Sequence, residues 1–252
     1  MVNQGNLSLC SDKGGCNMKS RYLSVAAIVM LIVAMSPFTI RAQSGGGGMG
    51  YFMIGYMKMG IGDLNDRLEE NGYTAIDDAF LSLGGGGHAV MGRLILGGEG
   101  HAIFNGEENN ELYNYSLSAG SGFFNVGYIA YSTPLLRLYP MIGFGGGGVT
   151  MKIAESAATP SFDEVLQNPK RSVQMDSGGF LLNVSLGADY TIAMAEGEDG
   201  AGGFIVGLRA GYVMTPIQGD WFIDADELSG SPDTGLTGFY IRLLIGGGGY
   251  GR

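Results

Sequence analysis

Apolar and polar residues alternate one by one along most of the chain after residue 46. In the clearest run, 180–192, the even positions carry Phe, Leu, Val, Leu, Ala, Tyr and Ile. The odd positions from Asn183 onward carry Asn, Ser, Gly, Asp and Thr. A period of two is that of a β-strand whose two faces meet different surroundings. Runs at 204–212 and 239–245 repeat the pattern, so the chain is predicted to be all-β.

Eight segments carry this strand pattern. The clearest runs, such as 180–192 and 204–212, are 9 to 13 residues long with one continuous apolar face, and a tilted strand that crosses a bilayer needs about 9–11 residues. In the fourth segment the apolar positions are odd at 113–119 and even at 124–130, which predicts a β-bulge around 120–122. The predicted strands are 47–59, 79–91, 93–105, 112–131, 136–153, 178–194, 203–216 and 236–249.

The connections between these strands alternate in length. The long ones are 60–78, 106–111, 154–177 and 217–235, and the short ones are Gly92, 132–135 and 195–202. Short turns at one rim and long loops at the other are typical of outer-membrane barrels, whose short turns face the periplasm. An even number of strands places both ends of the barrel at the short-turn rim. We therefore expect an eight-stranded antiparallel up-and-down transmembrane β-barrel with its mature N-terminus in the periplasm.

Two connections carry helix signals. The segment from Asp63 to Gly72 begins with an Asp suited to an N-cap and ends in Gly, which predicts a short helix. Ser161 and Glu164 have the spacing of a capping box, and Pro169 would stop the helix that follows.

The N-terminal segment has the features of an export signal. Lys19 and Arg21 precede an apolar run at 25–35, and a small-residue exit follows at Ala42. The run has eleven residues, whereas a spanning helix needs about 20. The sequence after Met18 opens like an ordinary signal peptide.

We therefore expect three parts: an upstream extension from a wrongly assigned start at 1–17, a signal peptide at 18–42, and one barrel domain at 43–252. Both cysteines, Cys10 and Cys16, lie in the upstream extension. The exported chain would then have no disulfide, and its stability would come from the barrel itself.

The charge is strongly acidic. The chain has 24 acidic and 14 basic residues, a net charge of −10, which argues against a nucleic-acid partner. Without the signal segment, Asp12 and four basic residues are lost, which leaves 23 acidic and 10 basic residues. The long connections hold 18 of those acids: Asp63, Asp66, Glu69, Glu70, Asp77, Asp78, Glu107, Glu108, Glu111, Glu155, Asp163, Glu164, Asp176, Asp220, Asp224, Asp226, Glu227 and Asp233.

Acidic loops on one rim attract divalent cations and repel anions. The acids at 220–227 carry oxygen ligands suited to Ca²⁺, but their spacing is not that of an EF-hand. A solvated acidic rim is the simpler interpretation, and no metal site or cofactor is predicted.

The strand and loop pattern resembles the eight-stranded outer-membrane barrels of the OmpA/OmpX/OmpW-like family over the whole mature chain. One departure is the C-terminus, Tyr250-Gly251-Arg252, because such barrels usually end on an aromatic residue. A secreted lipocalin-like barrel is the soluble alternative. The face opposite the apolar stripe carries Gly, Ser, Asn and a few charges rather than many Lys and Glu, which favours the membrane barrel.

The charges opposite the apolar stripe predict a polar network in the lumen. It would contain Arg137, Arg209, Arg242, Glu99 and Asp189, together with the two histidines, His88 and His101. Because an isolated buried charge is costly, at least two of the arginines are expected to contact Glu99, Asp189 or a lumen tyrosine such as Tyr139 or Tyr240. No serine stands out as a nucleophile beside a histidine, so no catalytic residue is predicted.

Glycine is abundant, with 47 residues and four tetraglycine runs. None of the runs has the Gly-Lys-Ser/Thr of a phosphate loop. Strand pairing would join the run at 84–87 to the near-copy Gly97-Gly98-Glu99-Gly100, and barrel closure would join the runs at 45–48 and 246–249. They are expected to form an outer-wall patch that seats a lipid chain, a partner protein or a second barrel. The simpler interpretation is that glycine only permits the strong curvature of a small barrel. The glycines assigned to this patch are Gly85, Gly87, Gly98, Gly100, Gly246 and Gly248.

The function expected from the sequence is that of a non-enzymatic outer-membrane barrel with a structural, adhesion or envelope-interaction role and with outer-membrane lipids as partners. The alternatives are a lipid-active outer-membrane enzyme and a lipocalin-like barrel that binds a small apolar ligand.

Overall fold

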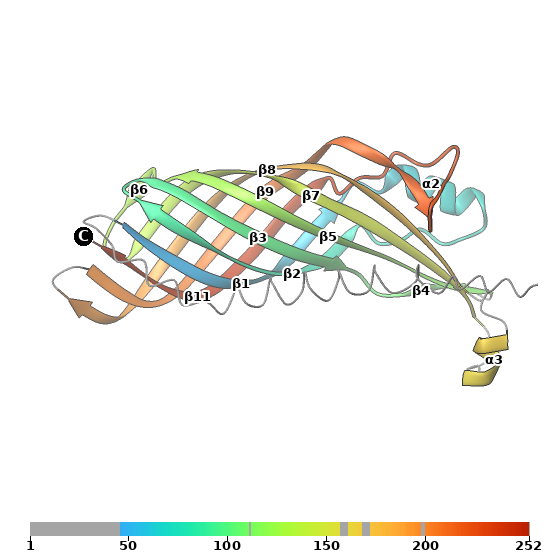
Figure 1. The fold of residues 1–252 in the computed structure, drawn as a ribbon, viewed down its shortest axis with the longest axis horizontal. Helices are drawn as coiled ribbons and strands as arrows, with labels where there is room; N and C mark the ends of the chain where they lie inside the picture. The colour runs from blue at the N-terminus through green and yellow to red at the C-terminus, as the bar shows by residue number, and fades with distance from the viewer. Residues whose placement is uncertain (1–45, 111, 157–160, 168–171, 198–199, 252) are drawn as a thin grey trace, which may run out of the picture. The chain divides into compact units, whose positions relative to one another are not determined.

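The computed structural model describes residues 46–110, 112–156, 161–167, 172–197 and 200–251, all within one compact unit. The expected extension and signal peptide lie outside the described residues. Figure 1 shows long strands that wind diagonally around a barrel. The eight long strands are β1 (Gly46–Met59), β2 (Ala79–Met91), β3 (Leu94–Phe104), β5 (Tyr113–Tyr128), β7 (Leu136–Glu155), β8 (Ser172–Gly197), β9 (Gly200–Ile223) and β11 (Gly238–Gly251).

The eight long strands form a closed antiparallel ring. The first strand, β1, pairs with β2 on one side and with β11 on the other, so Met53 lies opposite both Gly84 and Leu244. At the far side of the ring β5 pairs with β7. Each long strand therefore has two hydrogen-bonded neighbours, and the ring has no open edge at this level. The predicted eight-stranded antiparallel barrel is confirmed.

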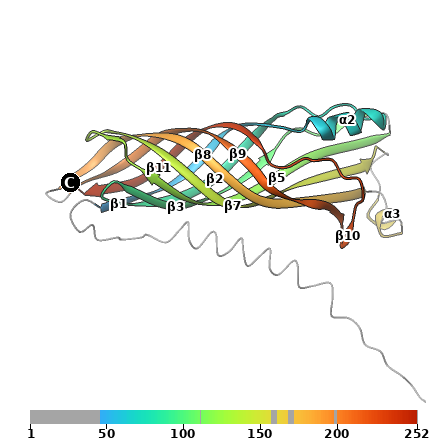
Figure 2. The same ribbon diagram turned by 90° about the horizontal axis from the view of Figure 1, so that it is seen from above.

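Three two-residue strands extend the ladders at the ends of the barrel: β4 (Glu108–Asn109), β6 (Tyr131–Ser132) and β10 (Asp226–Glu227). In Figures 1 and 2, the helices α2 (Gly62–Glu70) and α3 (Phe162–Gln167) lie at one end of the barrel and the C-terminus lies at the other, and Figure 2 also shows β10 at the helix end. The alternation of short turns and long loops is the one expected from the sequence.

Two strands are longer than predicted. The β8 strand has 26 residues and β9 has 24, and they pair as far as Asp176 and Phe222. Asp176 and Asp220, which were expected in loops, therefore lie on strands. On β8 the prediction failed because the side chains that share the outward face with Asp176 are polar, so the apolar pattern stops while the ladder continues. On β9 the register shifts between Met214 and Trp221 interrupt the alternation.

The predicted bulge in the fourth strand is wrong. Through residues 120–122, β5 keeps an unbroken register with both β3 and β7. Its odd residues face inward throughout, with Leu117 and Phe123 buried, while Phe124 and Tyr128 are exposed on the outer wall. The pattern changes because apolar side chains fill the lumen near the long loops and cover the outside nearer the turns. Register shifts occur instead between β8 and β9.

The lumen near the long loops is filled by an apolar cluster, which we call the loop-side core. The helix α2 (Gly62–Glu70) adds Leu64 and Leu68 to it. Its residues are Met57, Met59, Ile61, Leu64, Leu68, Ile76, Phe80, Ile103, Tyr115, Leu117, Phe123, Val149, Met151, Leu181, Val213, Trp221, Leu236 and Tyr240. A second cluster, the turn-side core, consists of Met49, Tyr51, Met53, Val90, Ile95, Ile129, Tyr139, Met141, Ile205 and Leu244.

Both predicted helices are present, but one begins differently. The α2 N-cap is Ile61, without a side-chain cap, so Asp63 lies inside the helix rather than capping it. Gly72 follows the helix with a φ of 82°, a conformation that favours glycine. The helix α3 (Phe162–Gln167) begins with the predicted capping box, in which Glu164 accepts from the Ser161 amide at 2.7 Å and donates its own amide to Ser161 Oγ at 3.3 Å.

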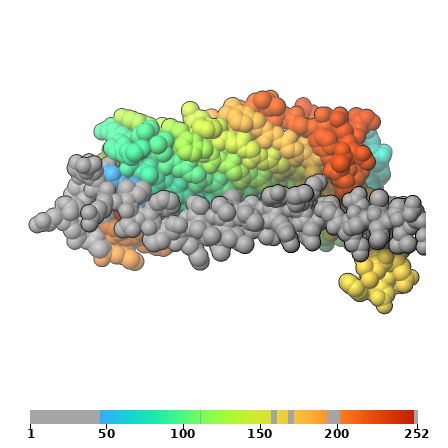
Figure 3. Space-filling view, in the orientation of Figure 1, coloured from blue at the N-terminus to red at the C-terminus, as the bar shows by residue number. Residues whose placement is uncertain are grey.

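The outer wall carries a band of exposed apolar side chains. Aromatic residues stand at both edges of this band, such as Tyr56 and Phe239 toward the loops and Tyr128 and Tyr190 toward the turns. Figure 3 shows one side of the wall, on which the strands pack without an opening. Within the band lie Phe52, Ile54, Phe124, Ile142, Phe144, Val184, Leu186, Leu208, Ile241, Leu243 and Ile245. None of the helices in the described part of the chain is long and apolar enough to cross a membrane.

Candidate functional site

A layer of buried polar side chains occupies the lumen between the two apolar cores. On β3, Glu99 and His101 lie between Ile95 of the turn-side core and Ile103 of the loop-side core. On β11, Arg242 stands in the same way between Tyr240 and Leu244. We call these residues the polar layer: Ser82, His88, Glu99, His101, Asn125, Asn183, Ser185, Asp189, Arg209 and Arg242.

The strongest contact in the polar layer joins Glu99 to Arg209. The Nη1 of Arg209 donates to Oε2 of Glu99, and neither side chain is exposed to solvent. The Nη2 of Arg209 donates to the Tyr139 hydroxyl at 3.2 Å, and its Cζ lies 5.3 Å from the centre of the Tyr51 ring. These additional contacts offset part of the cost of removing two charges from water.

Arg242 is held without an ion pair among the described residues. Its Nε donates to Ser82 Oγ at 3.2 Å, and its Nη1 lies 3.0 Å from His101 Nε2. Its guanidinium carbon stands 3.8 Å from the centre of the Tyr240 ring. A cation over an aromatic face is attracted by the electrons of the ring, and the attraction is larger where water is excluded.

His101 connects these two groups. Its Nε2 lies 3.0 Å from Arg242 Nη1 and 3.3 Å from Glu99 Oε1. A neutral ring nitrogen either accepts from the arginine or donates to the carboxylate, according to the tautomer. A chain of polar contacts therefore crosses the lumen from Arg242 through His101 and Glu99 to Arg209.

The chain continues to the turn-side end of the lumen. The Tyr139 hydroxyl accepts a hydrogen bond from Arg209 Nη2 and donates one to Asp189 Oδ1 at 3.0 Å. Arg137 lies opposite Asp189 in the ladder between β7 and β8, and its Nη1 donates to Thr191 Oγ1 at 3.4 Å.

The seven sequence-predicted residues of the lumen network lie on the inner face of the ring. His88 contacts aromatic rings, with its centroid 5.7 Å from that of Tyr51 and 6.1 Å from that of Tyr139. Two of the three arginines, Arg209 and Arg242, make the expected kind of contact with a glutamate or a lumen tyrosine.

Sequence reasoning missed five members or neighbours of the layer: Tyr51, Ser82, Asn125, Asn183 and Ser185. Asn183 accepts a hydrogen bond from the Tyr240 hydroxyl at 3.0 Å. The parity of the strand residues was a usable signal for the two asparagines, because both stand opposite the outward apolar stripe. Tyr51 gave no such signal, since β1 is apolar on both faces.

The inward glycines make room for these polar side chains. A Cβ at Gly97 would lie 2.6 Å from the Cβ of His88, and one at Gly211 would lie 2.7 Å from the Tyr240 hydroxyl. Cβ atoms at Gly84 and Gly187 would likewise overlap the rings of His101 and Tyr139. Large lumen side chains thus lie over glycines of the neighbouring strand, which accounts for part of the glycine content.

The outward glycines form only part of the predicted patch. Gly85 and Gly87 of β2 lie opposite Gly100 and Gly98 of β3, and all four face outward. The assignment of Gly246 and Gly248 to this patch is wrong. They share the parity of Arg242 and therefore face the lumen, and the outward residues of this run are Gly247 and Gly249.

We expect opposite results from alanine at two adjacent glycines of β3. At Gly97 a methyl group would meet the Gly87 carbonyl at 2.5 Å and the His88 Cβ, so Gly97→Ala should destabilise the barrel by about 2–3 kcal/mol. At Gly98 the nearest atom to a Cβ is the Phe123 carbonyl oxygen at 3.6 Å. Gly98→Ala should therefore stabilise the strand by about 0.5–1 kcal/mol, because alanine loses less backbone freedom on folding. Urea unfolding in detergent micelles measures both, and equal effects would contradict the assigned faces.

The polar layer has the chemistry of a structural network. The described residues contain no group of three or more His, Cys, Asp or Glu side chains that could hold a metal ion. Ser82 contacts Arg242, while His101 Nε2 faces Arg242 and Glu99. These contacts lock side chains of opposite walls to one another rather than presenting a nucleophile beside a base.

Comparisons with known proteins give fold-level likenesses. No protein-family model matches the chain, and no curated protein matches it. Among solved structures it is similar to Ail, the attachment invasion locus protein of Yersinia pestis, at 11% identity, a TM-score of 0.42 and coverage of 83% of this chain and 100% of that one.

Two proteins described as outer-membrane proteins are also similar to this chain. The outer-membrane protease OmpT of Escherichia coli matches at 10% identity and a TM-score of 0.35, with 82% and 97% of the two chains covered. The outer-membrane protein OprG of Pseudomonas aeruginosa matches at 12% identity and a TM-score of 0.27, with 83% and 96% covered. The assignment of an eight-stranded barrel rests on the strand pairings themselves.

Proposed function

We propose that this protein is a non-enzymatic outer-membrane β-barrel with a structural, adhesion or envelope-interaction role. The observation that carries the proposal is the outer wall, where large apolar side chains are exposed all around a closed ring and aromatic residues stand at both edges. Lipid-facing strands need such a band, whereas a water-facing wall would bury these side chains or replace them with polar ones.

The filled lumen supports a role without conduction or ligand storage. The two apolar cores and the polar layer occupy the inside of an eight-stranded ring, which leaves little room for water or a substrate. A lipocalin-like barrel would have its apolar face inside and its polar face in water. Here the band of large apolar residues on 180–192 and 239–245 faces outward instead.

The loop end supports an interaction role outside the cell. Most of the acidic side chains lie on the long connections and the strand ends beside them, so this end would be acidic and extracellular. The helix α3 has no buried residue, and its Phe162 and Leu166 are 78% and 66% exposed. An acidic surface with apolar side chains at its tip is suited to contact with another molecule.

Cell fractionation tests the proposed location and fold. The protein should sediment with outer membranes, resist extraction by salt, and dissolve only in detergent. On a gel the unheated sample should migrate differently from the boiled one, because a closed barrel resists unfolding by detergent at room temperature. Recovery as a soluble periplasmic protein would contradict the proposal.

A further inference from the structure

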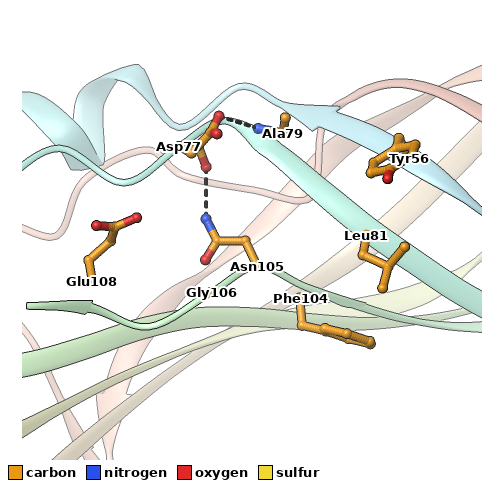
Figure 4. Close-up of a pocket in the computed structure, with 8 residues that line it drawn as sticks. All are labelled: Tyr56, Asp77, Ala79, Leu81, Phe104, Asn105, Gly106 and Glu108. Atoms are coloured by element: carbon orange, nitrogen blue, oxygen red, sulfur yellow. Dashed lines mark hydrogen bonds between the residues drawn. The ribbon is translucent and has the colours of Figure 1, made fainter.

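A groove lies on the outer wall where the apolar band meets the long loops. It has a volume of about 470 Å³ and is formed by the loop-side ends of β1, β2 and β3 and the segment that leads to β4. Figure 4 shows its two halves, with Tyr56, Leu81 and Phe104 on the strands and Asp77, Asn105 and Glu108 toward the loops. One half is apolar, and the other consists of the carboxylates of Asp77 and Glu108 and the amide of Asn105.

The apolar half is a single row across three strands. Leu81 of β2 lies opposite Tyr56 of β1 and opposite Phe104 of β3, and the three side chains face outward. Tyr56 and Phe104 belong to the aromatic edge of the band, the level at which aromatic residues meet lipid head groups. The groove therefore opens at the head-group level.

The polar half has two carboxylates without an ion pair among the described residues. The nearby Lys58 is engaged with Asp78 at 3.2 Å rather than with Asp77 or Glu108. The Asn105 amide nitrogen donates to the Asp77 carbonyl at 3.0 Å, which leaves Asn105 Oδ1 as a buried acceptor with no partner in the described structure. This half has negative charge and an unused acceptor, so it suits a cation with N–H donors.

We propose that the groove binds the ammonium head group of a membrane lipid. Since Asp77 Oδ1 accepts from the Ala79 amide at 3.0 Å, the ammonium would donate to Asp77 Oδ2, the Glu108 carboxylate and Asn105 Oδ1, while the adjoining hydrocarbon lies on Tyr56 and Leu81. The apolar row and the head-group level favour an amphiphile, and the two carboxylates favour an ammonium-bearing head group over one that is only anionic. This inference rests on the membrane location proposed above.

The wall below the groove continues the binding surface. Along β2 and β3 the outward pairs after Leu81 end in Gly85 with Gly100 and Gly87 with Gly98, between the exposed rings of Phe52 and Phe124. Six residues of strand span about 20 Å, and one leaflet of the hydrocarbon core is about 15 Å thick. An acyl chain whose head group is in the groove would follow this bare stretch of wall.

Lipid retention measured by native mass spectrometry tests the proposal. The full barrel in detergent is mixed with equal amounts of phosphatidylethanolamine and phosphatidylglycerol with identical chains. We expect about fivefold more ethanolamine lipid retained, the factor that corresponds to about 1 kcal/mol. The pair Asp77→Asn with Glu108→Gln should remove the preference, and Ala79→Trp, which fills the groove without changing its charge, should lower retention of the ethanolamine lipid.

The matched control is Asp226→Asn with Glu227→Gln on β10, which removes one Asp and one Glu charge from residues that pair with β9 and do not line the groove. This control should keep the preference for the ethanolamine lipid, because the groove is unchanged. That result would exclude the overall charge of the protein as the cause of the preference. An inserted barrel that retains both lipids equally, or a control pair that abolishes the preference as well, would overturn the proposal. Failure of the wild-type barrel to insert into vesicles would instead contradict the proposed function, so the two failures are distinguishable.

Discussion

Glu99→Gln is expected to destabilise the barrel by about 3–5 kcal/mol, the usual cost of removing one member of a buried ion pair. Glu99 is the carboxylate bound by Arg209, and it also lies beside His101, which faces Arg242. Glutamine keeps the shape but leaves the buried Arg209 guanidinium without its ion-pair partner. The free energy of unfolding in urea, measured in detergent micelles, gives the size of the effect.

A double variant distinguishes charge from packing in this experiment. Glu99→Leu combined with Arg209→Met removes the pair together, and it should cost less than either single change because no new unpaired charge is left. The exposed change Asp226→Asn serves as the control and should stay within about 0.5 kcal/mol. A loss below about 1 kcal/mol for Glu99→Gln would mean that water or other groups already compensate Arg209.

The wall of the barrel was predictable because each strand separates two unlike environments. One face of each strand carries large apolar side chains, and the other carries small or charged ones. This difference produces a period of two in the sequence, as at 180–192 and 204–212. The connection lengths then fix the order of the ring, since short turns join neighbours. The number of strands, their directions and the face on which each side chain lies could therefore be predicted from local patterns.

The loop-side end was less predictable because the same contrast is inverted there. Near the loops the lumen is apolar and the outside is polar, so Leu117 faces inward while Phe124 of the same strand faces outward. Read as one pattern, the inversion imitates a bulge. For the same reason the sequence pattern did not predict the loop-side end of β8, and register shifts interrupt the pattern on β9, although strand pairing continues beyond the apolar band on both.

The contacts inside the polar layer lie beyond what strand patterns can specify. Glu99 and Arg209 are 110 residues apart, and three strands separate β3 from β9 in the ring. Parity places both side chains in the lumen, but the partner across the lumen depends on the stagger of all the intervening pairings. Gly246 illustrates the same point on a small scale, since an error of one residue moves a glycine from the outer wall to the lumen.

Leu186→Arg is expected to destabilise the barrel in lipid by about 2–4 kcal/mol, the cost measured for a cationic side chain near the middle of a bilayer. Leu186 is 68% exposed on β8 and lies in the middle of the apolar run at 180–192. Leu166→Arg is the matched control, because Leu166 is 66% exposed on α3 at the loop end. The control should change stability by less than about 0.5 kcal/mol.

Refolding from urea into lipid vesicles measures the change in stability for both variants. In the proposed membrane topology the two leucines differ in whether hydrocarbon or water surrounds them. Their exposure is nearly equal, so a protein surrounded by water would tolerate arginine at both positions. In a bilayer only Leu186 faces hydrocarbon, because α3 follows the end of β7 beyond the band. A neutral Leu186→Arg would place the apolar band in water or against another protein, and the membrane topology would then have to be abandoned.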